Sequence, residues 1–133
     1  MITRIRLVFC LFVFSSTVSF HASGKDCLDP EGSGLWADCR AANALEAADA
    51  QLNVAYRKLM FELKKNKYVQ EVKNLTTAQR LWIKYRQEYC NVVGNLRGGS
   101  PDWQASYFTR CRAEVAIGRT AELEQLYKDV FEQ

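Results

Sequence analysis

The sequence is almost without histidine, and the one it has, His21, lies near the N-terminus. Two arginines, Arg4 and Arg6, precede the apolar run 7–14, and small residues follow at 22–24. This is the pattern of a secretory signal peptide, and the apolar run is too short to span a bilayer as a helix. We therefore expect residues 1–24 to be removed on export. The remaining chain would lack an imidazole base and any Ser-His or Cys-His pair, which favours a binding protein over an enzyme.

The chain also lacks a large excess of charge of either sign. The chain has 18 basic and 15 acidic residues, and loss of residues 1–24 would leave 16 and 15, a net charge of +1. This balance favours neither nucleic acid nor an anionic membrane as a partner. Residues 25–133 are long enough for one domain with a single core.

Five cysteines are present. Cys10 lies inside the expected signal, without the small residues that precede a lipoprotein cysteine, so we expect a soluble periplasmic or secreted product. The other four are an even set, which in an exported chain predicts two disulfides: Cys27, Cys39, Cys90 and Cys111. Their wide spacing does not fit a four-cysteine zinc site. We expect no metal and no cofactor.

Glycine and proline are missing from residues 36–65. Within this stretch, residues step by three or four along one helix face, which predicts a first helix: Leu45, Asp49, Leu52, Tyr56, Leu59 and Leu63. Residues 76–79, Thr-Thr-Ala-Gln, have the form of a capping box and predict a second helix from about residue 78 to Gly94. Ser100 before Pro101 predicts the start of a third helix, which runs to about Phe131.

No segment alternates as a strand does. The sequence predicts an all-α fold, an antiparallel three-helix bundle with an irregular lead-in over residues 25–35. With the first turn centred near residue 71, Cys39 lies roughly 20 Å along the helix axis from the level of Cys90, too far for a disulfide. The expected disulfides are therefore Cys27–Cys39 and Cys90–Cys111.

Several polar residues lie on or beside the apolar stripes, where they need partners. We interpret them as a structural polar core: Asp49, Asn53, Gln79, Arg86 and Arg119. An acid–base or binding site is the alternative, but no second carboxylate lies at a useful spacing, so no catalytic residue is assigned. Trp82, Tyr85 and Tyr89 are at helical spacing and are expected in the core.

Aromatic, glycine and acidic residues gather at one end of the expected bundle. Between residues 26 and 49, six acidic residues stand against Arg40 alone. Exposed aromatics commonly anchor protein interfaces, although packing as a cap explains these equally well. The candidate partner-binding residues are Trp36, Asp38, Gly98, Gly99, Ser100, Asp102 and Trp103.

Three blocks of the sequence resemble the LprI-like lysozyme inhibitor family. Residues 48–56 resemble its A-D-x-x-L-N-x-x-Y, and residues 78–90 resemble A-Q-R-x-W-I-x-[FY]-R-x-x-x-C. Residues 98–100 and 111–123 are similar to its G-G-S…C…R-x-x-E-L ending. The resemblance implies one small helical envelope domain over 25–133 that inhibits lysozyme or a related cell-wall hydrolase. A periplasmic adaptor or immunity-type module without lysozyme inhibition is the alternative.

Overall fold

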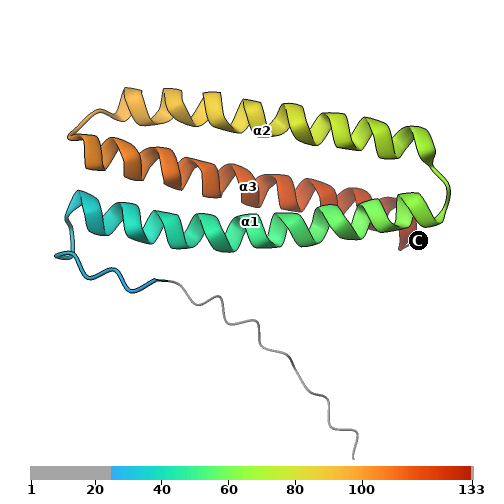
Figure 1. The fold of residues 1–133 in the computed structure, drawn as a ribbon, viewed down its shortest axis with the longest axis horizontal. Coiled ribbons are helices and arrows are strands. Elements are labelled where there is room, and N and C mark those ends of the chain that lie inside the picture. Colours follow the sequence, from blue (N-terminus) through green and yellow to red (C-terminus); the bar gives the residue numbers. More distant parts are fainter. Residues whose placement is uncertain (1–24, 133) are drawn as a thin grey trace, which may run out of the picture.

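Three helices make up the fold: α1 (Gly34–Lys65), α2 (Val69–Arg97) and α3 (Pro101–Phe131). The computed structural model describes residues 25–132, so the expected signal segment, with His21 and Cys10, lies outside the described residues. The helices run side by side in an elongated antiparallel bundle, as predicted (Figure 1). No helix in the described part is long and apolar enough to cross a membrane.

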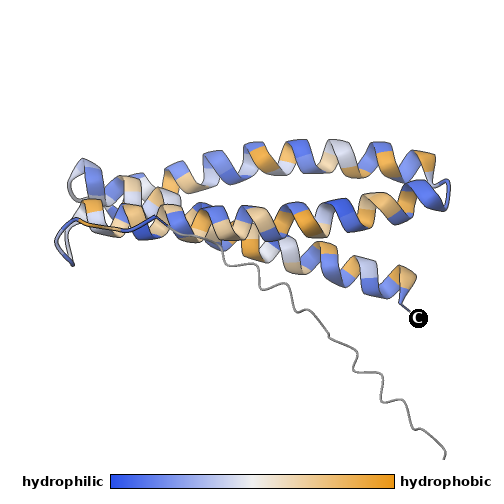
Figure 2. Cartoon of the chain, turned by 60° about the horizontal axis from the view of Figure 1, so that its bottom comes forward, coloured by the Kyte–Doolittle hydropathy of each residue, from blue (hydrophilic) through white to orange (hydrophobic). Residues whose placement is uncertain are grey.

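The core lies between α1 and α3, which share the most extensive contact in the bundle. Apolar and polar residues share the surface of each helix (Figure 2), so each helix has a side suited to burial. Small side chains let the two helix backbones come close, and leucines fill the space between them. The buried cluster consists of Ala48, Leu52, Ala55, Leu59 and Leu63 of α1 with Ala113, Ala116 and Leu123 of α3.

The second helix is much less buried than its aromatic stripe predicts. Its buried residues are Arg86, Cys90 and Gly94, all in its C-terminal half. Trp82 packs against the core, but Tyr85 and Tyr89 are exposed and stack on each other. The prediction of a core position for these two tyrosines is therefore wrong. The physical reason is that α1 and α3 fill the core with each other and leave α2 only a narrow strip of contact.

The turn between α1 and α2 comes earlier than the capping box predicts. Thr76 lies inside α2, and its hydroxyl donates to the carbonyl oxygen of Val72 at 2.7 Å, so it does not cap a helix. Instead, α1 ends in a Schellman motif, in which the Tyr68 N–H donates to Leu63 O and the Lys67 N–H to Lys64 O. The two helices are thus joined by three residues.

Gly94 does not end α2, which continues to Arg97. A Cβ atom at Gly94 would lie 3.1 Å from the carbonyl oxygen of Gln104 and 3.3 Å from Cβ of Phe108. The glycine therefore serves a close approach of α2 to α3 rather than a helix end. Near this approach, Cys90 and Cys111 form one of the two predicted disulfides, with their Cα atoms 5.6 Å apart.

Candidate functional site

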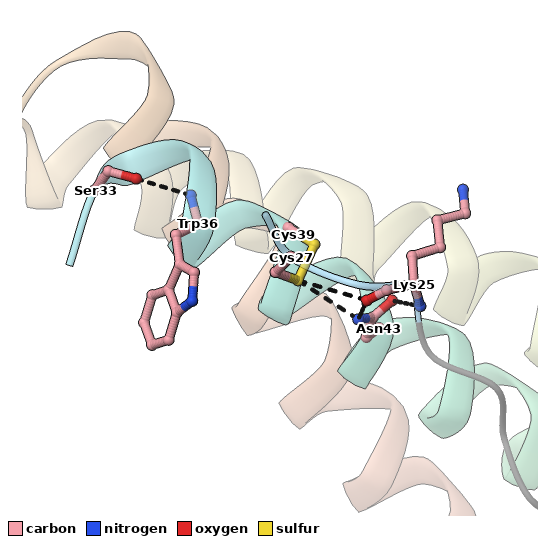
Figure 3. The surroundings of a disulfide bond; sticks show 6 residues. All are labelled: Lys25, Cys27, Ser33, Trp36, Cys39 and Asn43. Atoms are coloured by element: carbon pink, nitrogen blue, oxygen red, sulfur yellow. Dashed lines mark hydrogen bonds between the residues drawn. A yellow bond between two sulfur atoms is a disulfide. The ribbon is translucent and has the colours of Figure 1, made fainter. Parts of the chain in front are cut away.

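The lead-in before α1 is irregular but fixed in place. The predicted disulfide Cys27–Cys39 joins it to α1, with the Cα atoms 5.7 Å apart. One turn further along, the Asn43 side chain pairs with the backbone of Lys25: its Nδ2 donates to the Lys25 carbonyl at 2.7 Å, and its Oδ1 accepts from the Lys25 N–H at 3.0 Å (Figure 3). The lead-in therefore lies along the first turns of α1.

The start of α1 lies directly against the start of α3. A Cβ atom at Gly34 would lie 2.8 Å from Cβ of Asp102, a distance that only glycine permits. Ser33 caps α1 by accepting the Trp36 N–H on its hydroxyl at 3.2 Å. The close approach of Gly34 to Asp102 places Trp36 and Trp103 at the same end of the bundle, as predicted.

The loop between α2 and α3 is built by two glycines in the left-handed region, Gly98 at φ 66° and Gly99 at φ 92°. The Gln104 side chain donates to the Gly99 carbonyl at 3.0 Å and holds the loop over the first turn of α3. Ser100 is the N-cap of α3, but its hydroxyl makes no capping bond. Asp102 is exposed in the first helical turn, where a negative charge suits the helix dipole. Both polar side chains face solvent, Ser100 at the end of the loop and Asp102 in the first turn of α3.

Both tryptophans are half-buried. The Arg40 guanidinium lies over the Trp36 ring, 5.1 Å from its centroid. Trp103 packs beside Gly99, and its ring centroid is 5.9 Å from that of Tyr107. The packing holds each ring in one orientation and leaves part of its surface accessible.

The acidic residues between positions 26 and 49 fall into two groups. Asp38 is half-buried and accepts a hydrogen bond from the Thr109 hydroxyl at 3.1 Å, so it links α1 to α3. Asp49 is paired with Arg86. The other four are exposed and form no ion pair within residues 25–132: Asp26, Asp29, Glu31 and Glu46. This second group is free to meet a partner's charge, and so is Asp102, which is also exposed and forms no ion pair within residues 25–132.

Three leucines at this end are exposed, and no sequence pattern predicts them as part of the site. Leu28 in the lead-in is 90% exposed, Leu96 in the last turn of α2 is 82% exposed, and Leu35 in the first turn of α1 is also exposed. Apolar side chains left in solvent near unpaired charges are typical of protein interfaces. The signal in the sequence is slight: Leu28 lies two residues before Pro30 and Leu35 directly follows Gly34, and both are outside the apolar stripe of the first helix.

The proposed polar core forms two links between helices. Arg86 donates to Asp49 across α2 and α1, and Arg119 Nε donates to Gln79 Oε1 at 3.2 Å across α3 and α2. Arg119 also pairs with Glu122 at 2.8 Å. Asn53, however, is exposed, so its assignment to the core is wrong. It follows Leu52 by one residue and is turned about 100° away from the buried stripe.

Among residues 25–132, no group of three His, Cys, Asp or Glu side chains could hold a metal ion. The end of the bundle that holds the glycine loop instead offers a binding surface of exposed leucines, half-buried tryptophans, the loop itself and unpaired carboxylates. Its residues are Leu28, Leu35, Leu96, Trp36, Trp103, the loop 98–100 and the carboxylates Asp26, Asp29, Glu31 and Asp102. We call it the acidic aromatic end.

The family comparison agrees with this architecture. The model of the family Lysozyme inhibitor LprI matches residues 35–123, covering both ends of the bundle and all three helices. The chain belongs to this family. The lead-in that carries Cys27 lies before the matched range, so the acids in this lead-in lie outside the family core.

A relative with a similar sequence is the uncharacterized protein R02472 of Rhizobium meliloti (strain 1021). It is 36% identical over 90 residues, which cover 60% of this chain and 63% of the relative. The alignment thus spans less than two thirds of that relative's length. No solved structure matches this LprI-family chain.

Proposed function

We propose that this LprI-family protein is exported and inhibits a lysozyme or a related cell-wall hydrolase by binding it, without catalysis of its own. Membership in an inhibitor family supports the class of partner. The two disulfides support export, because disulfides persist in oxidising compartments. The absence of a membrane-spanning helix in the described part fits a soluble product.

The observation that carries the proposal is the composition of the acidic aromatic end. Affinity in protein complexes comes mainly from a few apolar and aromatic anchors that lose water on binding. Leu96 and Trp103 supply such groups on either side of the glycine loop, and Leu28 supplies another in the lead-in that is tied to α1. The loop is already ordered by Gln104, so binding would cost little further conformational entropy.

The glycine loop fits the shape of the expected target. A cell-wall glycosidase has a cleft lined by two carboxyl groups and by groups that hydrogen-bond sugars. Ser100 offers a free hydroxyl, and Gly98 and Gly99 let the backbone enter a narrow cleft. In the proposed complex the loop lies in the cleft, and Asp29 and Glu31 lie toward basic residues on the rim of the enzyme.

The test is a titration of the purified protein against several classes of lysozyme, measured by clearing of a cell-wall suspension. We expect saturable inhibition of at least one class at one-to-one stoichiometry. A folded protein that inhibits none of them would reject the proposal and favour the adaptor or immunity-type function.

A further inference from the structure

The opposite end of the bundle, where α1 turns into α2, has a different chemistry (Figure 1). We call the surface at this turn the basic tip. It consists of three lysines and two uncharged residues from the turn and the adjoining helix ends: Lys64, Lys67, Lys73, Tyr68 and Val69. All five are exposed. The basic tip has no part in the proposed lysozyme contact.

The lysines surround an apolar hollow of about 230 Å³. Leu63, Val69 and Val72 form its apolar lining together with Tyr68, and all three tip lysines lie at its edge. No carboxylate lines the hollow, and none forms an ion pair with these lysines within residues 25–132. The hollow therefore combines apolar surface with three lysines that form no ion pair in the described chain, while the nearby Glu71 lines the adjoining groove.

A second, mostly apolar groove shares Leu63 and Tyr68 with this hollow and has a volume of about 470 Å³. It runs between the N-terminal half of α2 and the C-terminal end of α3, with Leu59 and Leu63 of α1 among its lining residues. The groove exists because α2 packs on the other helices mainly through its C-terminal half. Tyr68, which lines both hollows, remains 45% exposed, and Val69 remains 64% exposed.

The backbone of Lys67 has a conformation that is unfavourable for any residue other than glycine. It is the left-handed residue of the Schellman motif, at φ 61°, where glycine is usual. It is also the only non-glycine residue with positive φ in the described chain. A lysine here has a cost in stability that a glycine would not have, and it adds a third positive charge to the hollow.

We propose that the basic tip docks on an anionic lipid bilayer. The charges are complementary, because lysines are attracted to acidic headgroups. The uncharged residues suit the same surface: a tyrosine is favoured at the membrane interface, and a valine beside it can enter the headgroup region. With three unpaired lysines the binding is weak, reversible and lowered by salt.

The charge of about +1 for residues 25–133 does not reveal this surface, because acidic residues elsewhere in the chain offset the three tip lysines. Docking through the basic tip would leave the acidic aromatic end directed away from the bilayer, since the two lie at opposite ends of the rod (Figure 1). Membrane docking and enzyme binding would therefore be compatible in one molecule.

The experiment is sedimentation of the purified protein with vesicles of phosphatidylglycerol and phosphatidylcholine, compared with vesicles of phosphatidylcholine alone. We expect binding to the anionic vesicles at low salt and little binding to the neutral ones. The variant Lys64→Gln/Lys67→Gly/Lys73→Gln should partition roughly a hundredfold less, since each lysine near the surface contributes about fivefold. Val69→Ser should also weaken binding.

The matched control is Arg57→Gln/Arg80→Gln/Lys84→Gln, which removes the same charge from exposed positions away from the turn. It should keep most of the binding. Lys67→Gly alone should lose about fivefold in partition while melting at a higher temperature, so its weaker binding would not reflect misfolding.

Three results would overturn the proposal: no binding of the parent to anionic vesicles at low salt, equal binding to neutral vesicles, or equal losses in the tip and control variants. Lysozyme inhibition is a separate readout. The tip variant should inhibit like the parent, so failure of membrane docking is distinguishable from failure of the proposed function.

Discussion

Arg86 of α2 donates a hydrogen bond from Nη1 to Oδ1 of Asp49 on α1, and its guanidinium lies 4.8 Å from the centroid of the Trp82 ring. The arginine side chain is 9% exposed, whereas that of Asp49 is 35% exposed. This pair links the two helices that share the least contact in the bundle. It therefore fixes how α2 lies against α1 where few apolar side chains do so.

Asp49→Ala should leave the buried guanidinium of Arg86 without its partner. We expect the free energy of unfolding to fall by about 3 kcal/mol. This value is at the low end of the range for a broken buried ion pair, because Asp49 is partly exposed to water. The double variant Asp49→Ala/Arg86→Met should recover much of this loss, since no charge is then buried. Denaturant unfolding measures both. A single variant as stable as the parent but without enzyme inhibition would show that Asp49 acts in binding instead.

Two glycines inside helices should respond in opposite ways to alanine. Gly94→Ala places a Cβ atom 3.1 Å from a carbonyl oxygen of α3, and the resulting overpacking should cost about 1–3 kcal/mol. Gly118→Ala meets no atom within 4 Å and should stabilise α3 by about 0.5–1 kcal/mol. Thermal melts measure both effects: the melting temperature should fall for Gly94→Ala and rise for Gly118→Ala. A shift of both melting temperatures in the same direction would contradict the close approach of α2 to α3.

The two disulfides should differ in their effects. Cys90→Ala/Cys111→Ala removes a link between two packed helices and should lower the free energy of unfolding by about 3 kcal/mol. Cys27→Ser/Cys39→Ser releases a lead-in that has no buried residue, so the bundle should lose less. Hydrogen exchange should show faster exchange near residues 25–33 in this second variant. An equal loss of global stability in both variants would mean that the lead-in is part of the cooperative core.

Charge reversal in the lead-in should slow association with the enzyme. Asp29→Lys/Glu31→Lys changes two exposed, unpaired carboxylates, and such changes act mainly on the association rate at low salt. The fitting control is Glu71→Lys/Glu124→Lys, a change of equal charge on exposed carboxylates of α2 and α3 that form no ion pair within residues 25–132. Association kinetics at two salt concentrations measure the effect, and equal slowing by both variants would argue against a role for the lead-in.

The helical periodicity was enough to predict the bundle because α1 carries an apolar stripe that is buried against small and apolar residues of α3. It failed for α2, whose stripe continues through Tyr85 and Tyr89 where no neighbouring helix covers it. Periodicity identifies a face but not how much surface the rest of the chain has available to cover it.

Turns and helix ends were predicted less well for local reasons. The Thr76 hydroxyl bonds back to Val72 within α2 instead of capping it, so α2 begins at Val69, well before the capping box predicts. The end of α1 at Lys65 agrees with the stretch 36–65 that predicts the first helix. The candidate site was predicted in part: its loop residues lie together, but Asp38 is held by Thr109, and the exposed Leu28 and Leu96 belong to no pattern.

The most direct test of the inhibitory role of the acidic aromatic end is the inhibition constant of the variant Ser100→Ala/Asp102→Ala/Trp103→Ala. It should be measured beside the parent on a lysozyme that the parent inhibits, with circular dichroism to establish folding. The basic-tip variant Lys64→Gln/Lys67→Gly/Lys73→Gln is the control. We predict a loss of inhibition of at least about tenfold, as expected when an interface anchor is removed, and no loss in the control. Unchanged inhibition by the folded loop variant would contradict the account.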